Sequence, residues 1–428
     1  MSKNINKLES FSQELFHLTK NWLDWDKNEE TRKEILDLVE NEKFDKLSSC
    51  MFGRLSFGTA GMRAPMSAGF NRLNDLTMIQ TAQGFLRYLQ KTFAPEVLQI
   101  RGIVVGHDAR HNSQRFAHIL TNVFARHSVK VNLFSKIVPT PFVSFAVAKL
   151  HCVAGAMVTA SHNPKEDNGF KVYWSNGAQI LSPHDQNICT TVKENLEPWA
   201  ESWNVPCNIY EFSNFVVDPY AKILGAYMEQ ALSNCHFKIS NTSTSLKFTY
   251  TPVHGVGYYF TPELLKQFGF KDDSLCYVKE QIMPDPNFPT APFPNPEEGE
   301  TVLVLAVGFL YLKRDKKFLG KASNVYVINS AVSSRIAGSI AKSEGFNYEE
   351  TLTGFKWMAN RAHELICLGK TVLLCWEESI GYLPGGLSLD KDGVLTAAIF
   401  AEYAAYLKGS MNNKGFADHL EFLYANSV

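Results

Sequence analysis

The chain has 428 residues, and 42 Lys and Arg stand against 43 Asp and Glu, so the formal net charge at pH 7 is -1. This balance excludes a bulk electrostatic attraction to nucleic acid or to an anionic membrane, so any anion must be recognised locally by a few placed cations. The hydrophobic content of 45% is ordinary for a globular protein, and the length suffices for roughly two to four domains.

The cysteines, the N-terminal residues and the apolar runs further limit the class of protein to which this sequence can belong. Eight cysteines are scattered without a C-x-x-C pair, which argues against a zinc knuckle or a disulfide framework. The first residues lack the apolar segment of a signal peptide, and the longest apolar run, 302–312, is shorter than the ~20 residues that cross a bilayer. We therefore expect a cytoplasmic protein with reduced thiols and with neither a membrane nor a nucleic-acid partner.

Helical and strand patterns alternate along the first half of the chain. Residues 5–23 place apolar side chains at the spacing of an amphipathic helix, and a glycine-punctuated loop follows from Arg54. The next predicted elements are a helix over 76–93, a strand over 103–106, a helix over 113–128 and a strand over 129–134. This alternation is typical of an α/β domain with a largely parallel sheet. A second such unit is predicted from about Phe212 and a third from about Asn324.

The hydrophobic run CVAGAMV, residues 152–158, ends abruptly in T-A-S-H-N-P. Ser161 thus follows a buried strand, at the place where α/β folds present reactive groups. Downstream, Asn176-Gly177 inside KVYWSNGAQI is a strong signal for a hairpin, which would fix the direction of Lys171. A turn or cap role is the common alternative for a single serine near a proline.

Hydrolase chemistry does not fit Ser161, because no G-x-S-x-G elbow surrounds it or any other serine. A phosphorylated serine fits better. It would need cations and a metal to hold the dianion, and an acid–base group to move a proton on and off a hydroxyl.

Six stretches, in order along nearly the whole chain, carry a resemblance to a known family. They are FGTAGMR (57–63), GHDAR (106–110), TASHNPKEDNGFKVYWSNGAQI (159–180), TPVHGVG (251–257), LTGFKWM (352–358) and WEESIGYLPG (376–385). Together they resemble the α-D-phosphohexomutases, and most of all the eukaryotic phosphoglucomutase/phosphopentomutase branch, which includes glucose-1,6-bisphosphate synthase. The resemblance implies tandem α/β domains with mixed, mainly parallel sheets. We place their borders at 1–211, 212–320 and 321–428.

The resemblance also implies a reaction and its residues. The family interconverts a sugar 1-phosphate and the terminal sugar phosphate through a phosphoserine and a bisphosphate intermediate. Ser161 would carry the phosphate, Lys171 would shuttle the proton, and His162 would stabilise phosphate charge. The implied substrate-binding residues are Thr59, Arg63, Asn163, Gly354, Lys356, Glu377 and Ser379. We expect a monomer that acts on small sugar phosphates.

Several motif residues keep a structural alternative. Asp108 and Arg110 are interpreted as a loop ion pair, with Ser113 capping the next helix, rather than as catalytic groups. The structural alternative for Lys356 is a lysine at the start of a helix. From the residues alone, Glu377 is interpreted equally well as half of a solvated charge pair with the glutamate that follows it, and the resemblance favours the sugar-binding role instead. The turn that contains His254 is predicted to be packed, and we assign it no chemistry.

The sequence also departs from the family pattern. The resemblance implies Mg²⁺, bound by a D-x-D-x-D-R loop and by the phosphate on Ser161, and a sugar 1,6-bisphosphate primer. No such loop is present, and residues 299–324, where it should fall, contain one aspartate, Asp315. Asp390 and Asp392 are the first alternatives as metal ligands.

Nothing after Asn413 resembles the R-x-S-G-T phosphate loop of the family's fourth domain. We thus expect an incomplete second domain and no fourth domain. Two alternatives to a mutase follow, a catalytically impaired isoform or fragment that only binds sugar phosphate, and a glucose-1,6-bisphosphate synthase.

Overall fold

The computed structural model describes residues 4–59, 61–291, 322–379, 381–410 and 415–427. The chain forms two compact units, which we name unit 1 and unit 2. Unit 1 comprises residues 1–136, 150–172 and 180–219, and unit 2 comprises residues 137–149, 173–179 and 220–428. Within the described ranges, no helix is both long and apolar enough to cross a membrane.

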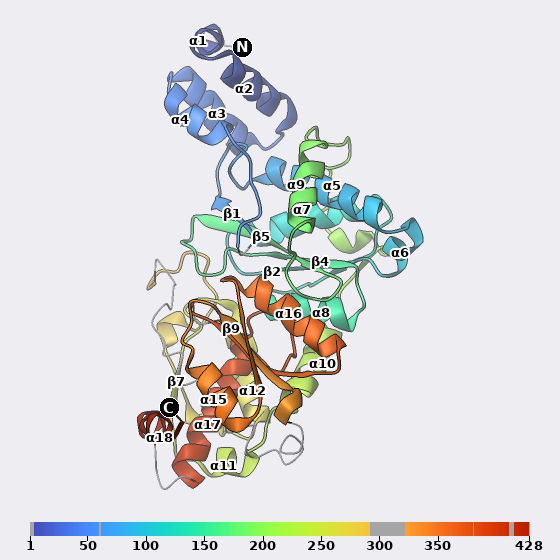
Figure 1. Ribbon diagram of the computed structural model, residues 1–428. Coiled ribbons are helices and arrows are strands. Elements are labelled where there is room, and N and C mark those ends of the chain that lie inside the picture. Colours follow the sequence, from blue (N-terminus) through green and yellow to red (C-terminus); the bar gives the residue numbers. More distant parts are fainter. Residues whose placement is uncertain (1–3, 60, 292–321, 380, 411–414, 428) are drawn as a thin grey trace. The chain divides into compact units, whose positions relative to one another are not determined.

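Unit 1 is built on a six-stranded sheet with the order β1-β5-β4-β2-β3-β6 (Figure 1). The strands are β1 (Met62–Pro65), β2 (Ile103–His107), β3 (Val131–Leu133), β4 (Ala154–Val158), β5 (Asp167–Trp174) and β6 (Val216–Val217). β2 runs parallel to β3 and β4, whereas β1 runs antiparallel to β5. All residues of β2 and β4 are buried, as expected for central strands of a parallel sheet.

The helices of the sheet domain in unit 1 are α5 (Asp75–Thr92), α6 (Pro95–Ile100), α7 (Ser113–Ala125) and α9 (His184–Lys193). α5 contacts both α7 and α9, and the three helices lie side by side in Figure 1. α5 begins at a capping box, in which the side chains of Asn74 and Thr77 each bond the other's backbone N–H. Nearly every residue of its first four turns is buried, so α5 is a central helix of this unit.

Four helices precede the sheet: α1 (Asn4–Phe11), α2 (Gln13–Trp25), α3 (Glu29–Glu40) and α4 (Phe44–Met51). The single helix predicted over 5–23 is therefore two helices. Ser12 separates them, because its side chain accepts a hydrogen bond from the Leu15 N–H at 3.2 Å and starts a new helix there. The four helices share a core with the segment that follows them, where the Trp22 and Phe70 rings are 5.1 Å apart.

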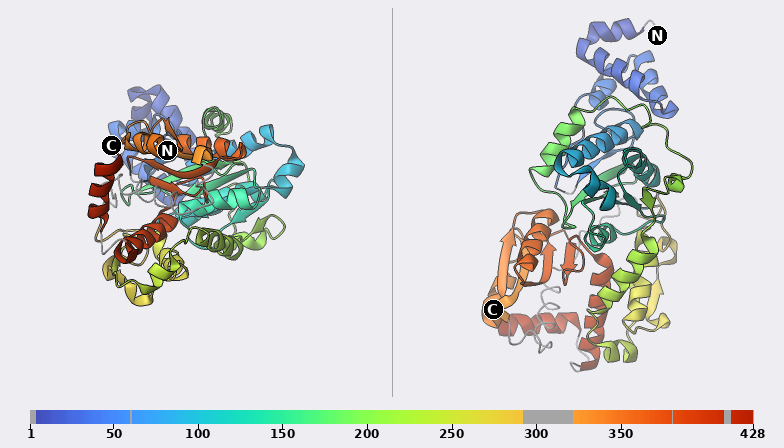
Figure 2. Two further views of the ribbon diagram at one scale, coloured as in Figure 1. Left: turned by 60° about the horizontal axis from the view of Figure 1, so that its bottom comes forward. Right: turned by 90° about the vertical axis from the view of Figure 1, so that its right-hand side faces the viewer.

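Unit 2 contains a four-stranded sheet with the order β10-β9-β11-β12, and Figure 2 shows its orange strands side by side. The strands are β9 (Val325–Ser330), β10 (Asn347–Thr351), β11 (Thr371–Glu377) and β12 (Gly381–Pro384), with α15 (Ile336–Glu344) and α16 (Phe355–Cys367) between them. β9 pairs in parallel with β10 and β11, and β12 closes the edge antiparallel to β11.

The rest of unit 2 is mainly helical. Its elements are α8 (Thr140–Lys149), α10 (Tyr220–Leu232), α11 (Lys238–Ser243), α12 (Thr261–Gln267), α17 (Gly393–Ser410), α18 (Phe416–Ser427) and the parallel strand pair β7 (Phe248–Tyr250) and β8 (Leu275–Tyr277). Short 3-10 helices cover Ile209–Glu211 in unit 1, and Val256–Tyr259, Asp272–Ser274, Lys279–Gln281 and Ala322–Asn324 in unit 2.

The predicted fold class is confirmed, because strands and helices alternate in both units around mixed, mainly parallel sheets. The predicted domain borders at 211 and 320 stay predictions. Residues 292–321, where the sequence places Asp315 and the incomplete part of the second domain, lie outside the described residues, as do 411–414.

Candidate functional site

Ser161 lies in the turn that follows β4 in unit 1. Its backbone adopts a left-handed conformation with φ 55°, and its N–H donates a hydrogen bond to Thr159 Oγ1 at 2.9 Å. The Asn163 N–H closes the same turn on the Ala160 carbonyl at 3.1 Å. A non-glycine residue adopts a positive φ at a cost, and such residues are concentrated at functional sites. The turn leaves Ser161 exposed, directly after a fully buried strand.

Arg63 on β1 reaches this serine from the neighbouring strand. Its guanidinium donates to Ser161 Oγ at 3.2 Å and to Asn163 Oδ1 at 2.8 Å. Burial, and then the charge of Arg110, lower the pKa of Arg63, while Asp167 opposes the shift. The Nε atom of Arg63 is buried and has no hydrogen-bond partner among the described residues. A half-buried guanidinium short of negative charge is suited to an anion on the serine.

Arg110, in the loop between β2 and α7, stabilises the same turn. Its side chain donates to four backbone carbonyls, those of Ser161 (2.9 Å), Asn163 (2.7 Å), Pro164 (2.8 Å) and Asp167 (3.2 Å). These carbonyls span the whole loop from the serine to the start of β5. Arg110 therefore fixes the conformation of the loop, and its contacts are structural rather than catalytic.

The predicted ion pair between Asp108 and Arg110 is confirmed, with Arg110 Nε 3.5 Å from Asp108 Oδ2. The predicted cap is wrong. Ser113 begins α7, but Asn112 occupies the N-cap position, and the Ser113 hydroxyl donates to Asp108 Oδ1 at 2.6 Å. The same hydroxyl accepts from Asn168 Nδ2 at 2.9 Å. A buried carboxylate that must be neutralised and hydrogen-bonded competes successfully with the helix end for this hydroxyl.

The FGTAGMR turn packs against Lys171. Gly58 and Gly61 form a bridge, and Thr59 is exposed at the turn between them. Gly61 has φ +93°, and a Cβ atom there would lie 2.7 Å from the Phe170 carbonyl and 3.1 Å from Lys171 Cγ. Only glycine permits this approach. The Lys171 side chain is 6% exposed, so the turn covers it.

The predicted hairpin at Asn176-Gly177 is confirmed in unit 2. Gly177 has φ +84°, its N–H bonds the Trp174 carbonyl at 2.8 Å, and Tyr173 pairs with Gln179 across the turn. The second strand is reduced to this one bridge. The hairpin therefore ends the strand β5 that carries Lys171.

The WEESIGYLPG motif forms the turn from β11 to β12 in unit 2. Glu377 is buried, and its carboxylate forms an ion pair with Lys391. Glu378 is exposed and accepts from the Ser330 hydroxyl at 2.5 Å, and Ser379 is exposed in the turn. Glu377 is therefore not half of a solvated pair, because burial and Lys391 distinguish it from Glu378.

The LTGFKWM motif starts α16 in the same unit. Gly354 occupies the N-cap position with φ 109°, and Lys356 follows in the first turn. The Lys356 side chain is half-buried, with its Nζ 5.8 Å from the centre of the Trp357 ring. Lys356 therefore lies at the start of a helix, as its structural alternative predicted, and its contact with the sugar stays a prediction.

The two histidines of the motifs differ in burial. His162 is half-buried beside Ser161. His254 is 3% exposed, and its Nε2 lies 2.8 Å from Thr290 Oγ1. The prediction of a packed turn at His254 is thus confirmed.

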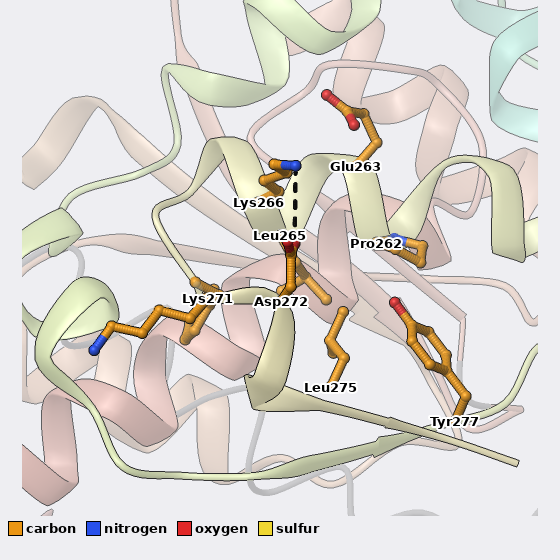
Figure 3. Close-up of a pocket in the computed structure, with 9 residues that line it drawn as sticks. Pro262, Glu263, Leu265, Lys266, Lys271, Asp272, Leu275 and Tyr277 are labelled. Carbon is orange, nitrogen blue, oxygen red and sulfur yellow. Dashed lines mark ion pairs between the residues drawn. The ribbon is translucent and has the colours of Figure 1, made fainter.

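A pocket of about 180 Å³ lies on α12 in unit 2 (Figure 3). Lys266 pairs with Asp272 across it at 3.8 Å, and both side chains are exposed. None of the motif residues lines this pocket. The hollow is therefore not a candidate for the chemistry that the motifs predict.

The described residues do not fit a magnesium site. No group of three His, Cys, Asp or Glu side chains that could hold a metal is found among them. Asp390 accepts from Tyr173 and Gln179, and Asp392 accepts from Tyr227, so both carboxylates, though buried, have protein partners. The alternative metal ligands predicted from the sequence are thus committed to structural bonds.

Comparison with known proteins gives a consistent result. The domain I, II and III models of phosphoglucomutase/phosphomannomutase match residues 54–199, 225–319 and 298–421. Phosphopentomutase of Homo sapiens is 41% identical, over 95% of this chain and 74% of its own length. This chain belongs to the phosphoglucomutase/phosphomannomutase family. It is by family a phosphosugar mutase, as predicted.

Other relatives are similar at comparable levels. Glucose 1,6-bisphosphate synthase of Homo sapiens is 42% identical over 90% of this chain and 70% of its own length, and phosphoribomutase of Saccharomyces cerevisiae is 35% identical over 92% and 71%. The crystal structure of a putative phosphomannomutase from Thermus thermophilus superposes with a TM-score of 0.66 at 23% identity, over 88% of this chain and 84% of that one. That structure supports the fold.

The structure thus gathers the predicted residues in two groups. Ser161, Arg63 and Asn163 are joined by hydrogen bonds in unit 1. Gly354, Lys356, Glu377 and Ser379 belong to unit 2. Sequence reasoning missed Lys391 as the partner of Glu377. The sequence signal for this pair was Lys391 itself, which lies between two aspartates in LDKDG. We interpreted that segment only as a source of alternative metal ligands.

Proposed function

We propose that the chain is a phosphoglucomutase/phosphopentomutase in which Ser161 carries the transferred phosphate. The observation that supports this most strongly is the half-buried Arg63, whose guanidinium lies 3.2 Å from Ser161 Oγ and whose buried Nε lacks a partner among the described residues. A phosphate on Ser161 would supply the negative charge that this guanidinium lacks.

The proposed step balances as follows. The bond between phosphorus and Ser161 Oγ breaks while a hydroxyl oxygen of the sugar phosphate bonds to phosphorus. The hydroxyl proton passes to the neutral amine of Lys171, which delivers it to Ser161 Oγ, so that the serine leaves as a neutral hydroxyl. The sugar bisphosphate that results returns its other phosphate to Ser161 by the reverse step. Arg63 and His162 stabilise the charge of the transferring group.

The binding roles in the proposal follow the same two groups. Thr59 and Asn163 contact the phosphate beside Ser161. The sugar is bound by four residues of unit 2, namely Glu377, Ser379, Lys356 and Gly354. The carboxylate of Glu377 accepts hydrogen bonds from sugar hydroxyls, and the hydroxyl of Ser379 can accept or donate them. A sugar 1,6-bisphosphate primes the enzyme by phosphorylating Ser161. The protein acts as a cytoplasmic monomer.

Magnesium is part of the family chemistry, where it would neutralise charge on the transferring phosphate. The described residues include no carboxylate cluster for it, so we assign no step to the metal. Ser161, through its phosphate, remains its one proposed contact.

A second candidate is a glucose-1,6-bisphosphate synthase, which the relative at 42% identity favours. Both activities would use Ser161. A synthase accumulates sugar bisphosphate in excess of the enzyme when a phosphoryl donor is supplied, whereas a mutase consumes only catalytic amounts.

The test is a mutase assay of the full chain with glucose 1-phosphate or ribose 1-phosphate, Mg²⁺ and glucose 1,6-bisphosphate. Ser161→Ala should lower turnover by at least about 10³-fold and remove the phosphate seen on Ser161 by mass spectrometry. Ser49→Ala, which removes an exposed hydroxyl bonded to the Lys46 carbonyl on α4, is the matched control and should keep full activity.

Equal rates for the wild type and Ser161→Ala would contradict the proposal. Thermal stabilisation by a sugar phosphate without turnover would then support the alternative of a protein that only binds its ligand.

A further inference from the structure

The side-chain amide of Asn360 connects two motifs that lie far apart in the sequence. Its Nδ2 donates to the Gln179 carbonyl at 2.9 Å and to the Lys356 carbonyl at 2.8 Å, and its Oδ1 accepts from Asn176 Nδ2 at 2.9 Å. Both N–H donors and the oxygen are therefore used. The orientation of the amide is fixed, because two of its partners are carbonyls that only accept.

One side of this connection is the hairpin that ends β5. Asn176 and Gln179 flank its turn, and the Asn176 side chain also accepts from the Ala178 N–H at 2.9 Å. Lys171, the proposed acid–base residue, lies on β5, and Asn176 follows the end of that strand five residues later. The strand is continuous from Lys171 to Trp174, so no loop intervenes between Lys171 and the start of the turn.

The other side is the first turn of α16. Lys356 and Asn360 are four residues apart on this helix, and the carbonyl that Asn360 binds belongs to Lys356 itself. Gly354 stands at the N-cap with φ 109°, so the loop enters the helix through a flexible residue. A side chain that holds this turn therefore also limits where the loop can lie.

A second set of bonds joins the same hairpin to the Glu377 turn. The Tyr173 hydroxyl donates a hydrogen bond to Asp390 Oδ2 at 2.5 Å, and Gln179 Nε2 donates one to the same oxygen at 3.1 Å. Asp390 Oδ1 accepts from the Lys391 N–H at 2.8 Å, and Lys391 forms the ion pair with Glu377. Asp390 is 1% exposed, so the hydrogen bonds to its carboxylate are shielded from solvent.

We propose that Asn360 is a positioning residue that locks the acid–base hairpin to the sugar-binding loop, so that sugar discrimination and proton transfer are adjusted together. This inference rests on the proposed function, which assigns proton transfer to Lys171 and sugar contacts to Lys356. Asn360 acts through these two residues and touches no reacting atom. Small displacements of groups that orient a substrate have large effects on rate.

The test compares Asn360→Asp with the wild type. Aspartate keeps the size of asparagine, removes both N–H donors and places a carboxylate against two carbonyl oxygens. We expect the ratio of kcat/KM for glucose 1-phosphate to kcat/KM for ribose 1-phosphate to change by at least about threefold. A loss of folded protein would scale both values equally and leave the ratio unchanged.

Two further variants define the specificity of the effect. Asn176→Ala removes one of the three hydrogen bonds and should shift the ratio in the same direction by a smaller factor. Asn324→Asp is the matched control, because the Asn324 amide donates to a single carbonyl, that of Gly369 at 3.0 Å, outside this network. It should leave the ratio unchanged.

Hydrogen exchange separates this inference from the proposed function. In Asn360→Asp, amides of residues 174–179 and 355–360 should both exchange faster, while amides of β2 should keep their rate. An unchanged substrate ratio in an active variant overturns the inference and leaves the proposed function intact. If the wild type does not exceed the Ser161→Ala blank, the proposed function fails. Exchange then decides alone: faster exchange in both segments supports the lock, and faster exchange in one or neither overturns it.

Discussion

Two loops of this protein follow the ends of buried strands and are stabilised by opposite charges. The loop after β4 carries Ser161 and contacts two arginines, the half-buried Arg63 and the buried Arg110. The turn after β11 carries the buried carboxylate of Glu377, with Lys391 as its partner. The same strand-end geometry thus provides an anion-binding loop in one unit and a carboxylate-bearing turn in the other. The difference lies in which charge the surrounding elements bury.

The pKa shifts caused by burial also differ between the two units. Burial lowers the pKa of Arg110, against the effect of Asp108 and Asp167, so the serine loop contains positive charge that is only partly compensated. In the other unit, burial raises the pKa of Asp392 to about 6. Burial thus disfavours the charged form in both units, that of an arginine in unit 1 and that of a carboxylate in unit 2.

The largest expected effect is the loss of the arginine that holds the serine loop. Arg110→Met leaves Asp108 without its cationic partner and four carbonyls without their donor, so we expect the free energy of unfolding to fall by about 3–5 kcal/mol. Thermal or urea unfolding measures this. Lys91→Met is the control, since the ion pair of Lys91 with Glu194 is exposed and should contribute less than about 1 kcal/mol. A loss for Arg110→Met no larger than the control would show that the loop does not depend on Arg110.

The next effect belongs to the carboxylates of unit 2 and depends on pH. Asp392 accepts from Tyr227 and from the Leu395 N–H, with Asp390 nearby as a further carboxylate. Its pKa is about 6 in the folded chain, against an ordinary value of 3.8 for an aspartate. Protonation therefore favours the folded state, and this contribution is fully present below the unfolded pKa and is lost as the pH rises through about 6.

The test compares the unfolding free energy of Asp392→Asn with that of the wild type from about pH 4 to about pH 7. Relative to the variant, the wild type should gain up to about 3 kcal/mol as the pH falls through this range. A difference between the two proteins that does not vary with pH would show that Asp392 has an ordinary pKa in the folded chain.

The smallest of the three effects concerns the turn after β11. Glu377→Gln keeps the shape of the side chain but removes the charge that pairs with Lys391, and we expect KM for the sugar phosphate to rise by about tenfold, which corresponds to about 1.4 kcal/mol. Steady-state kinetics measure this. Glu378→Gln is the control, because Glu378 is exposed and should change KM by less than about threefold. Equal effects of the two variants would remove the distinction between the glutamates.

The sequence was sufficient for those features that depend on neighbouring residues. The Asn176-Gly177 turn requires positive φ at glycine and was predicted from the dipeptide. The position of Ser161 after β4 followed from the apolar run that ends before it. The helix over 5–23 was wrong only at Ser12, where a local cap outweighs the continuous apolar spacing.

Features that join distant segments could not be predicted in this way. Arg110 binds carbonyls more than 50 residues away, and Asn360 binds a turn about 180 residues before it. The role of Ser113 was misjudged partly for the same reason, since its hydroxyl, besides donating to the nearby Asp108, accepts from Asn168 on β5, 55 residues later. Backbone carbonyls carry no sequence signal, so a side chain that binds them looks like any other polar residue.

The four N-terminal helices have a practical consequence for anyone who trims this protein for crystallography. The family domain model starts at residue 54, yet Trp22 covers Phe70, and the Asn28 amide bonds the buried Asp75 carboxylate at 2.8 Å. A recombinant fragment cut at residue 54 would uncover an aromatic side chain and one face of the cap of α5. A recombinant fragment should therefore not begin at the border of the family domain model. To remain folded and soluble, it has to include the four N-terminal helices.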